Sequence, residues 1–205
     1  MERYSYLSLT HRLHTSPISV FDLKTLQQIL GLRTQSALFP IIKKLTAADI
    51  IQEVTPGLYQ KTGQDNYFTI ANELVKPSYL SFETALNLYG ILSQGPQITT
   101  SATLGKTQIK SLSLGTFSYT RLSQTFYFGF AKQNNYLIAT PEKALLDYIY
   151  IYHKLGKPID LTEWDFEPLD SKKLSGYLDL LKTSPSYSAI IRIIMEQTPC
   201  LPPKN

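Results

Sequence analysis

The chain has 205 residues, of which 43% are hydrophobic, enough for one large or two small domains with buried cores. Its formal net charge of +4 and its pI of about 9.0 permit an anionic partner without requiring one. The lone cysteine, Cys200, excludes a disulfide framework within the chain and favours a reducing compartment. The first residues lack the apolar core of a signal peptide, and no apolar run approaches the roughly 20 residues of a membrane span. We therefore expect a cytoplasmic protein with no membrane partner.

Residues 1–15 are predicted to form an irregular amphipathic helix that carries three leucines among polar neighbours, Leu7, Leu9 and Leu13. His11 and His14 are three residues apart and can share one face of this helix. A metal site needs more ligands, and besides carboxylates the chain offers only His153 and Cys200. We therefore expect no metal.

The stretch from Phe21 to Tyr59 has the pattern of two short helices, a glycine turn between them and a hairpin. Asp22 is the predicted N-cap of the first helix, and Gly31 ends it, because glycine takes the left-handed conformation at little cost. The apolar face of this helix consists of Leu23, Leu26, Ile29 and Leu30. A second helix, from about Thr34, is expected to bury Leu38, Ile41, Ile42, Leu45 and Ala48. Pro56-Gly57 then signals a type II turn between two strands, and the whole pattern predicts a winged helix-turn-helix.

The outer face of the second helix supplies the candidate DNA contacts. Gln and Ser side chains can hydrogen-bond base edges, lysines can neutralise phosphates, and Phe39 can meet a thymine methyl group. With the start of the helix and the hairpin included, the predicted contacts are Arg33, Thr34, Gln35, Ser36, Lys43, Lys44, Tyr59 and Lys61. Pro40 is unusual inside a helix, so the helix either begins near Phe39 or is kinked there.

Two alternatives to a DNA-binding module stay open at this point. The helical pair can serve packing alone, or the winged fold can bind a protein partner without DNA. The charge distribution favours the second alternative, because residues 1–75 carry seven Lys or Arg against six Asp or Glu. Residues 76–159 carry eight against three, and five acids with no base follow between Asp160 and Asp170.

A domain boundary is predicted near residue 75, because Pro77 restricts the residue before it to extended geometry. This gives an N-terminal domain at 1–75 and a second domain at 76–205. Within the connector at 61–76, the run Tyr67-Phe68-Thr69-Ile70 is expected to form a strand.

The second domain is expected to be α+β, with a small antiparallel sheet flanked by helices. Ser81 and Gly90 are predicted to begin and end a short helix, and a two-residue period over 97–138 predicts about four antiparallel strands. Thr140 caps the next helix, with proline at its first position. That helix is expected to bury Ala144, Leu145, Tyr148, Ile149 and Tyr152. Two more helices are predicted at 171–182 and 186–196, before a loose tail with three prolines, Pro199, Pro202 and Pro203.

Two runs in this domain resemble signatures of the AbiEi family of antitoxins. They are Leu74 to Leu86, followed by Tyr89-Gly90, and Ile138 to Asp147. Similar elements lie between them at Gly115 to Tyr119 and at Phe128 to Phe130, so the resemblance extends from Phe21 to about Tyr152. It implies a winged-helix domain that represses its own operon by binding operator DNA. It also implies a C-terminal domain that counteracts a nucleotidyltransferase-type toxin, in a type IV toxin–antitoxin system of abortive infection.

No catalytic centre is predicted. The run from Thr103 to Thr107 resembles the end of a phosphate-binding loop, but Thr100 stands where that loop needs glycine. The acids after Asp160 leave a metal-dependent nuclease as a third hypothesis, for which Asp160 and Glu163 would be the test positions. We expect no enzyme activity and no cofactor.

Overall fold

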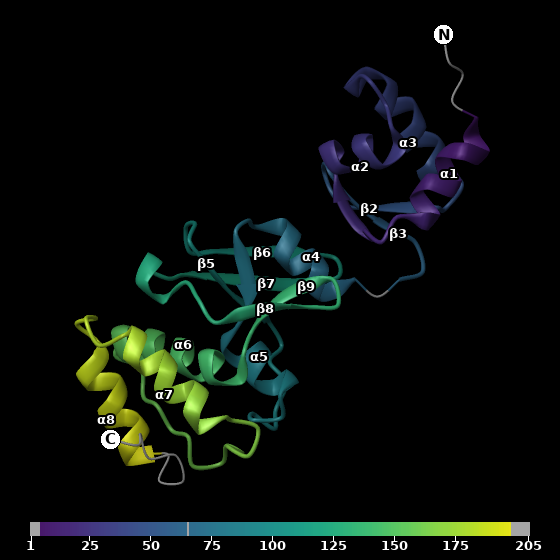
Figure 1. Ribbon diagram of the computed structural model, residues 1–205. Helices are drawn as coiled ribbons and strands as arrows, with labels where there is room; N and C mark the ends of the chain where they lie inside the picture. Colours follow the sequence, from purple (N-terminus) through teal and green to yellow (C-terminus); the bar gives the residue numbers. More distant parts are fainter. Residues whose placement is uncertain (1–4, 65, 198–205) are drawn as a thin grey trace. The chain divides into compact units, whose positions relative to one another are not determined.

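The chain folds into two units, Met1–Leu74 and Val75–Asn205, and the computed structural model describes residues 5–64 and 66–197 (Figure 1). The division falls one residue before the boundary expected from the sequence. Cys200 and the proline-rich tail lie outside the described residues. Among the residues that are described, no helix is long and apolar enough to cross a membrane.

The first unit combines helices with a three-stranded antiparallel sheet in the order β1-β3-β2. Its elements, in chain order, are α1 (Tyr6–Thr15), β1 (Val20–Asp22), α2 (Leu23–Leu30), the 3₁₀ turn η1 (Gln35–Ala37), α3 (Leu38–Ala47), β2 (Ile51–Thr55), β3 (Leu58–Lys61) and α4 (Tyr67–Leu74). The helices and the hairpin expected between Phe21 and Tyr59 are therefore present. The short strand β1, which pairs with β3, is an addition to the expected elements.

Local chemistry explains where α2 begins and ends. Its N-cap is Asp22, as predicted, and the Asp22 carboxylate accepts a hydrogen bond from the backbone N–H of Thr25 at 2.7 Å. Gly31 ends the helix in the left-handed conformation with φ of 69°. The guanidinium of Arg12 donates to the carbonyl of Leu30 at 2.9 Å, so a cation from α1 occupies the negative end of α2.

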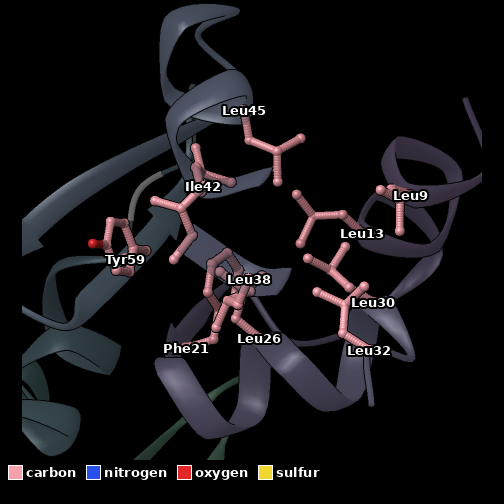
Figure 2. Close-up of a cluster of buried hydrophobic side chains, with 11 residues drawn as sticks. Leu9, Leu13, Phe21, Leu26, Leu30, Leu32, Leu38, Ile42, Leu45 and Tyr59 are labelled. Carbon is pink, nitrogen blue, oxygen red and sulfur yellow. The ribbon is translucent and has the colours of Figure 1, made fainter. Parts of the chain in front are cut away.

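The core of the first unit is built from leucines of α1, α2 and α3 that point toward one another in Figure 2. Of the three leucines of α1, Leu9 and Leu13 are buried, whereas Leu7 is 78% exposed. Burying a leucine side chain stabilises a fold by about 1.5–3 kcal/mol. This shared core therefore fixes α3 against α1 and α2, and with it the face that α3 presents outward.

The structure corrects the sequence prediction at two places in this unit. Tyr67 to Ile70 begin helix α4, although the aromatic and β-branched side chains favour a strand. The second helix of the pair begins at Leu38, after the 3₁₀ turn, and not near Thr34, so the alternative of a start near Phe39 is confirmed. Ala48 is exposed at the end of this helix. Pro40 therefore lies in the first turn of α3, where a backbone N–H has no acceptor within the helix and proline is tolerated.

The second unit contains a six-stranded mixed sheet in the order β6-β7-β5-β4-β9-β8. Its elements are β4 (Ser78–Leu80), α5 (Phe82–Leu88), β5 (Thr99–Thr103), β6 (Gln108–Leu112), β7 (Gly115–Arg121), η2 (Gln124–Phe126), β8 (Phe130–Gln133), β9 (Tyr136–Ala139), α6 (Pro141–Lys154), α7 (Ser171–Leu180) and α8 (Tyr187–Gln197). Helices α5 to α8 gather on one side of the sheet (Figure 1).

The prediction of an antiparallel sheet is wrong. Strand β5 pairs parallel with β7, and β4 pairs parallel with β9. The chain reverses direction between β5 and β6 and again between β6 and β7, so β7 runs parallel to β5. Strand β7 lies between β5 and β6, and β6 forms the edge of the sheet. The helices predicted after residue 140 are present, and of the side chains expected to be buried on α6 only Tyr152 is partly exposed.

Candidate nucleic-acid interface

Six of the eight predicted DNA contacts lie at the surface of one continuous stretch, from Arg33 to Lys44. Arg33 and Thr34 lie in the turn after α2, Gln35 and Ser36 begin η1, and the lysine pair belongs to α3; all six are exposed. The hydroxyl of Ser36 donates to that of Thr34 at 3.1 Å. The stretch presents hydroxyl, amide and cationic groups to solvent from the turn, η1 and α3.

The cations of this stretch have no acidic partner in the part of the chain that the structure describes. Across residues 5–64 and 66–197, no carboxylate forms an ion pair with Arg33, Lys43 or Lys44. Each of them can therefore meet an external anion without first breaking an internal ion pair. Phosphate groups of nucleic acid are the anions that such exposed side chains commonly neutralise.

A large apolar side chain lies among these polar groups. Phe39 is 54% exposed, although an aromatic side chain gains free energy from burial. It occupies the second position of α3, next to exposed Pro40 and one helical turn before Lys43. The core of the unit therefore leaves much of the Phe39 side chain in contact with solvent.

The remaining two predicted contacts have other partners. Tyr59 is only 8% exposed and donates its hydroxyl to the Glu53 carboxylate at 3.1 Å. Burial, together with that hydrogen bond, raises the pKa of Tyr59. Lys61 donates its ammonium to the carbonyl of Ser16 at 2.6 Å, and burial lowers the pKa of Lys61.

Lys61 also lines a groove of about 620 Å³ whose other lining residues include His11 and His14 of α1. Its side chain thus turns toward α1. The described part of the chain holds no group of three or more His, Cys, Asp or Glu residues that could bind a metal ion.

In the second unit, the two runs that resemble the AbiEi signatures meet at a buried polar cluster of four side chains. Tyr79 and Ser81 come from the first run, and Lys143 and Asp147 come from the second. The Asp147 carboxylate accepts hydrogen bonds from Tyr79 at 2.9 Å and Ser81 at 2.8 Å, and it forms an ion pair with Lys143. Lys143 also donates to the Tyr79 hydroxyl at 3.0 Å. All four residues are fully buried.

Burial sets the protonation chemistry of this cluster. It lowers the pKa of the Lys143 ammonium and raises the pKa of the Asp147 carboxyl, while the contact between the two groups opposes both shifts. Burial and the neighbouring Asp147 carboxylate also raise the pKa of Tyr79, so that its hydroxyl stays a hydrogen-bond donor. The cluster has no solvent-exposed atom to offer a ligand, and its geometry is that of a polar link between β4 and α6.

The sequence contains one feature that indicates this cluster. The hydrophobic periodicity and the capping residues, taken alone, predict only a helix core and helix ends at Tyr79, Ser81, Lys143 and Asp147. Lys143 and Asp147 are four residues apart on a helix stretch that is otherwise apolar, so both point the same way into the interior. The prediction that Ser81 caps α5 is wrong in one respect, because its hydroxyl makes no capping hydrogen bond and donates to Asp147.

The acids after Asp160 mostly serve the local backbone. The Asp160 carboxylate accepts from the N–H and the hydroxyl of Thr162, and Asp165 accepts from the N–H of Glu167. Hydrogen bonds from Thr162 lower the pKa of Asp160. Asp170 is the N-cap of α7.

No family model matches the chain, and no curated protein matches it. The resemblance to AbiEi antitoxins therefore stays a prediction, and the function has to be inferred from the residues and their geometry.

Proposed function

We propose that the first unit is a winged helix-turn-helix module that binds DNA through α3 and the turn before it. The observation that carries the proposal is the exposed stretch from Arg33 to Lys44, whose three cations lack an acidic partner within the described residues. A helix of this kind fits the major groove of DNA, where polar side chains reach base edges and lysines reach phosphates.

The order of elements in this unit supports the proposal. A helix and a short strand precede the pair α2 and α3, and the hairpin of β2 and β3 follows them, with β1 beside β3. This order is the one found in winged helices. Tyr59 and Lys61 are left out of the proposed contact surface, because one is buried and the other turns toward α1.

We further propose that the protein is an antitoxin that represses its own operon and counteracts a nucleotidyltransferase-type toxin. This part rests on the resemblance of the two runs to the AbiEi family. Both runs contribute side chains to the buried cluster around Asp147. Its hydrogen bonds give a physical reason for the polar residues that these runs carry inside the core. We assign the protein no catalytic activity.

Binding of the purified protein to DNA from upstream of its own gene tests the DNA-binding proposal. In a gel-shift titration at low salt, where phosphate contacts are strongest, we expect a discrete complex that competitor DNA of unrelated sequence does not abolish. Absence of any complex at low salt would overturn it. Co-expression with the product of the adjacent gene tests the antitoxin role, since the antitoxin should relieve growth arrest.

A second candidate function is a protein-interaction module without a DNA role. The exposed apolar side chains of α1, Tyr6 at 44% and Leu7 at 78%, favour it, as does the near-neutral charge of residues 1–75. A protein that fails the gel shift but retains the neighbouring gene product in a pull-down, and loses it in Leu7→Asp, would support this alternative.

A further inference from the structure

We propose that Phe39 contacts the C5-methyl group of a thymine in the major groove and so selects thymine at one position of the binding site. The inference rests on the proposed DNA-binding function and adds to it the base that α3 recognises. It starts from the exposure of Phe39, 54%, on the face of α3 that carries cations without an acidic partner among the described residues.

The surroundings of Phe39 decide between a protein surface and a base as its partner. A protein docking site places an exposed aromatic ring among other apolar side chains with few charges. Phe39 instead has Gln35 and Ser36 before it and Lys43 and Lys44 after it, all of them exposed. Between Arg33 and Lys44, its only exposed apolar neighbour is Pro40.

A single apolar group among polar and cationic groups matches the edge of a thymine. In the major groove, thymine presents a carbonyl acceptor and a methyl group, and the methyl is the one apolar group that the four bases offer there. Lys43 and Lys44 lie one to two turns after Phe39 on the same helix. They can reach phosphates and position the helix while Phe39 reaches a base edge.

The position of Phe39 in the fold makes the contact geometrically defined. Leu38 and Ile42, on either side in sequence, are buried in the shared core with 0% and 8% exposure. The backbone that carries Phe39 is therefore held in place, and Pro40 removes further freedom from it. An aromatic side chain has only two side-chain torsions, so on such a backbone it loses little entropy on contact and can discriminate a methyl group from a hydrogen atom.

The experiment combines a change in the protein with a change of one methyl group in the DNA. Purified full-length protein first selects duplexes from a random library. Each thymine in the selected site is then replaced by deoxyuridine, which lacks only the methyl group. We expect one such replacement to weaken wild-type binding about fourfold, the effect of one buried methyl group.

Phe39→Ala should bind the thymine duplex at least as weakly as the wild type binds the deoxyuridine duplex, and should not respond further to the replacement. Phe39→Leu, which keeps an apolar side chain, should retain part of the response. Leu180→Ala, which changes another exposed apolar side chain on α7, is the matched control and should behave as wild type. Circular dichroism checks that each variant is folded.

The outcomes separate this inference from the function it rests on. If the wild type selects no sequence and binds no duplex at low salt, both the DNA-binding function and the inference fail. If the wild type binds DNA but no thymine replacement matters, or Phe39→Ala responds to it as strongly as the wild type, only the role of Phe39 is overturned.

Discussion

The ion pair of Lys143 and Asp147 shows, at the level of single residues, why a buried charge has to be fully hydrogen-bonded. Removing two charges from water costs several kcal/mol per ion, and their attraction offsets this only with additional hydrogen bonds. Tyr79 and Ser81 supply these bonds to Asp147. Each member of the cluster therefore depends on the others, and removal of one leaves a buried group without its partner.

Asp147→Ala should destabilise the second unit by about 3–5 kcal/mol, because it leaves the Lys143 ammonium buried and unpaired. Lys143→Met should also destabilise the unit, but the double variant should cost at least about 1 kcal/mol less than the sum of the two single variants. Urea unfolding followed by the fluorescence of Trp164, the one tryptophan of the chain, reports on this unit. Exposed Glu163→Ala is the control and should change stability little. Additive costs would mean that the pair contributes no coupling.

Gly31 serves both the turn after α2 and the hydrogen bond of Arg12. Its φ of +69° strains any other residue, and a Cβ there would lie 2.1 Å from Nη1 of Arg12. Gly31→Ala should therefore cost about 1–2 kcal/mol of strain and about 1 kcal/mol more for the displaced hydrogen bond to Leu30. Thermal unfolding by circular dichroism measures the loss.

Gly63→Ala is the matched control for this change. Gly63 has φ of +76°, and among the described residues beyond its chain neighbours no atom would lie within 4 Å of a Cβ added there, so this position carries the strain alone. In an Arg12→Ala background, Gly31→Ala should cost no more than Gly63→Ala. An unchanged cost in that background would show that Arg12 plays no part.

At the level of elements, the Glu142 side chain links α6 to the start of α7. Its Oε1 accepts from the backbone N–H of Asp170 at 3.0 Å, and its Oε2 lies 3.4 Å from the ammonium of Lys173. Its place at the start of α6 predicts only that it complements the positive end of its own helix. In the structure the same carboxylate also accepts a hydrogen bond from Asp170, the N-cap of α7.

Glu142→Ala should free the first turn of α7. Amide hydrogen exchange at Asp170 should accelerate about tenfold, because the donor loses its buried acceptor. Glu142→Gln keeps an oxygen at the Oε1 position and should leave this amide near its wild-type rate. Equal acceleration in both variants would show that the charge of Glu142, and not the hydrogen bond, holds the turn.

Elements could be predicted best where a local signal sets them. Asp22 and Gly31 bound α2, and Thr140 begins α6, as their capping chemistry requires. The strand predicted for Tyr67 to Ile70 is wrong. The side chains of this run favour a strand, but the N–H of Ile70 donates to the carbonyl of Asn66, and this bond belongs to the first turn of α4. The parallel pairs of the sheet have no local signal at all, because they join strands that are not neighbours in the chain.

The same reason limits what could be predicted of the sites. The exposed stretch from Arg33 to Lys44 is contiguous, so its residues could be named from the sequence at and before one predicted helix. The turn of Lys61 toward Ser16 depends on packing across 45 residues of sequence. The cluster around Asp147 joins residues up to 68 positions apart, and only the fold brings them together.

Across the full chain, the most basic region of the sequence and the proposed DNA contact lie in different units. Residues 76–159 have the larger excess of Lys and Arg, yet part of it is internal, because Lys143 is buried against Asp147. The exposed lysines of α3 belong to a nearly neutral segment. Our proposal therefore rests on the arrangement of exposed cations along α3 and not on the net charge of the segment.

Salt dependence of DNA binding can assign the phosphate contacts to one unit. Each phosphate contact adds about 0.9 to the slope of log affinity against log salt concentration. Lys43→Ala with Lys44→Ala should therefore reduce that slope by about 1.8, whereas Lys106→Ala with Lys110→Ala, a pair of exposed lysines in the second unit, should leave it unchanged. Fluorescence anisotropy of a labelled duplex at several salt concentrations gives both slopes. The reverse result, with only the second pair lowering the slope, would place the phosphate contacts in the second unit and remove the electrostatic basis for α3 as the DNA-binding element.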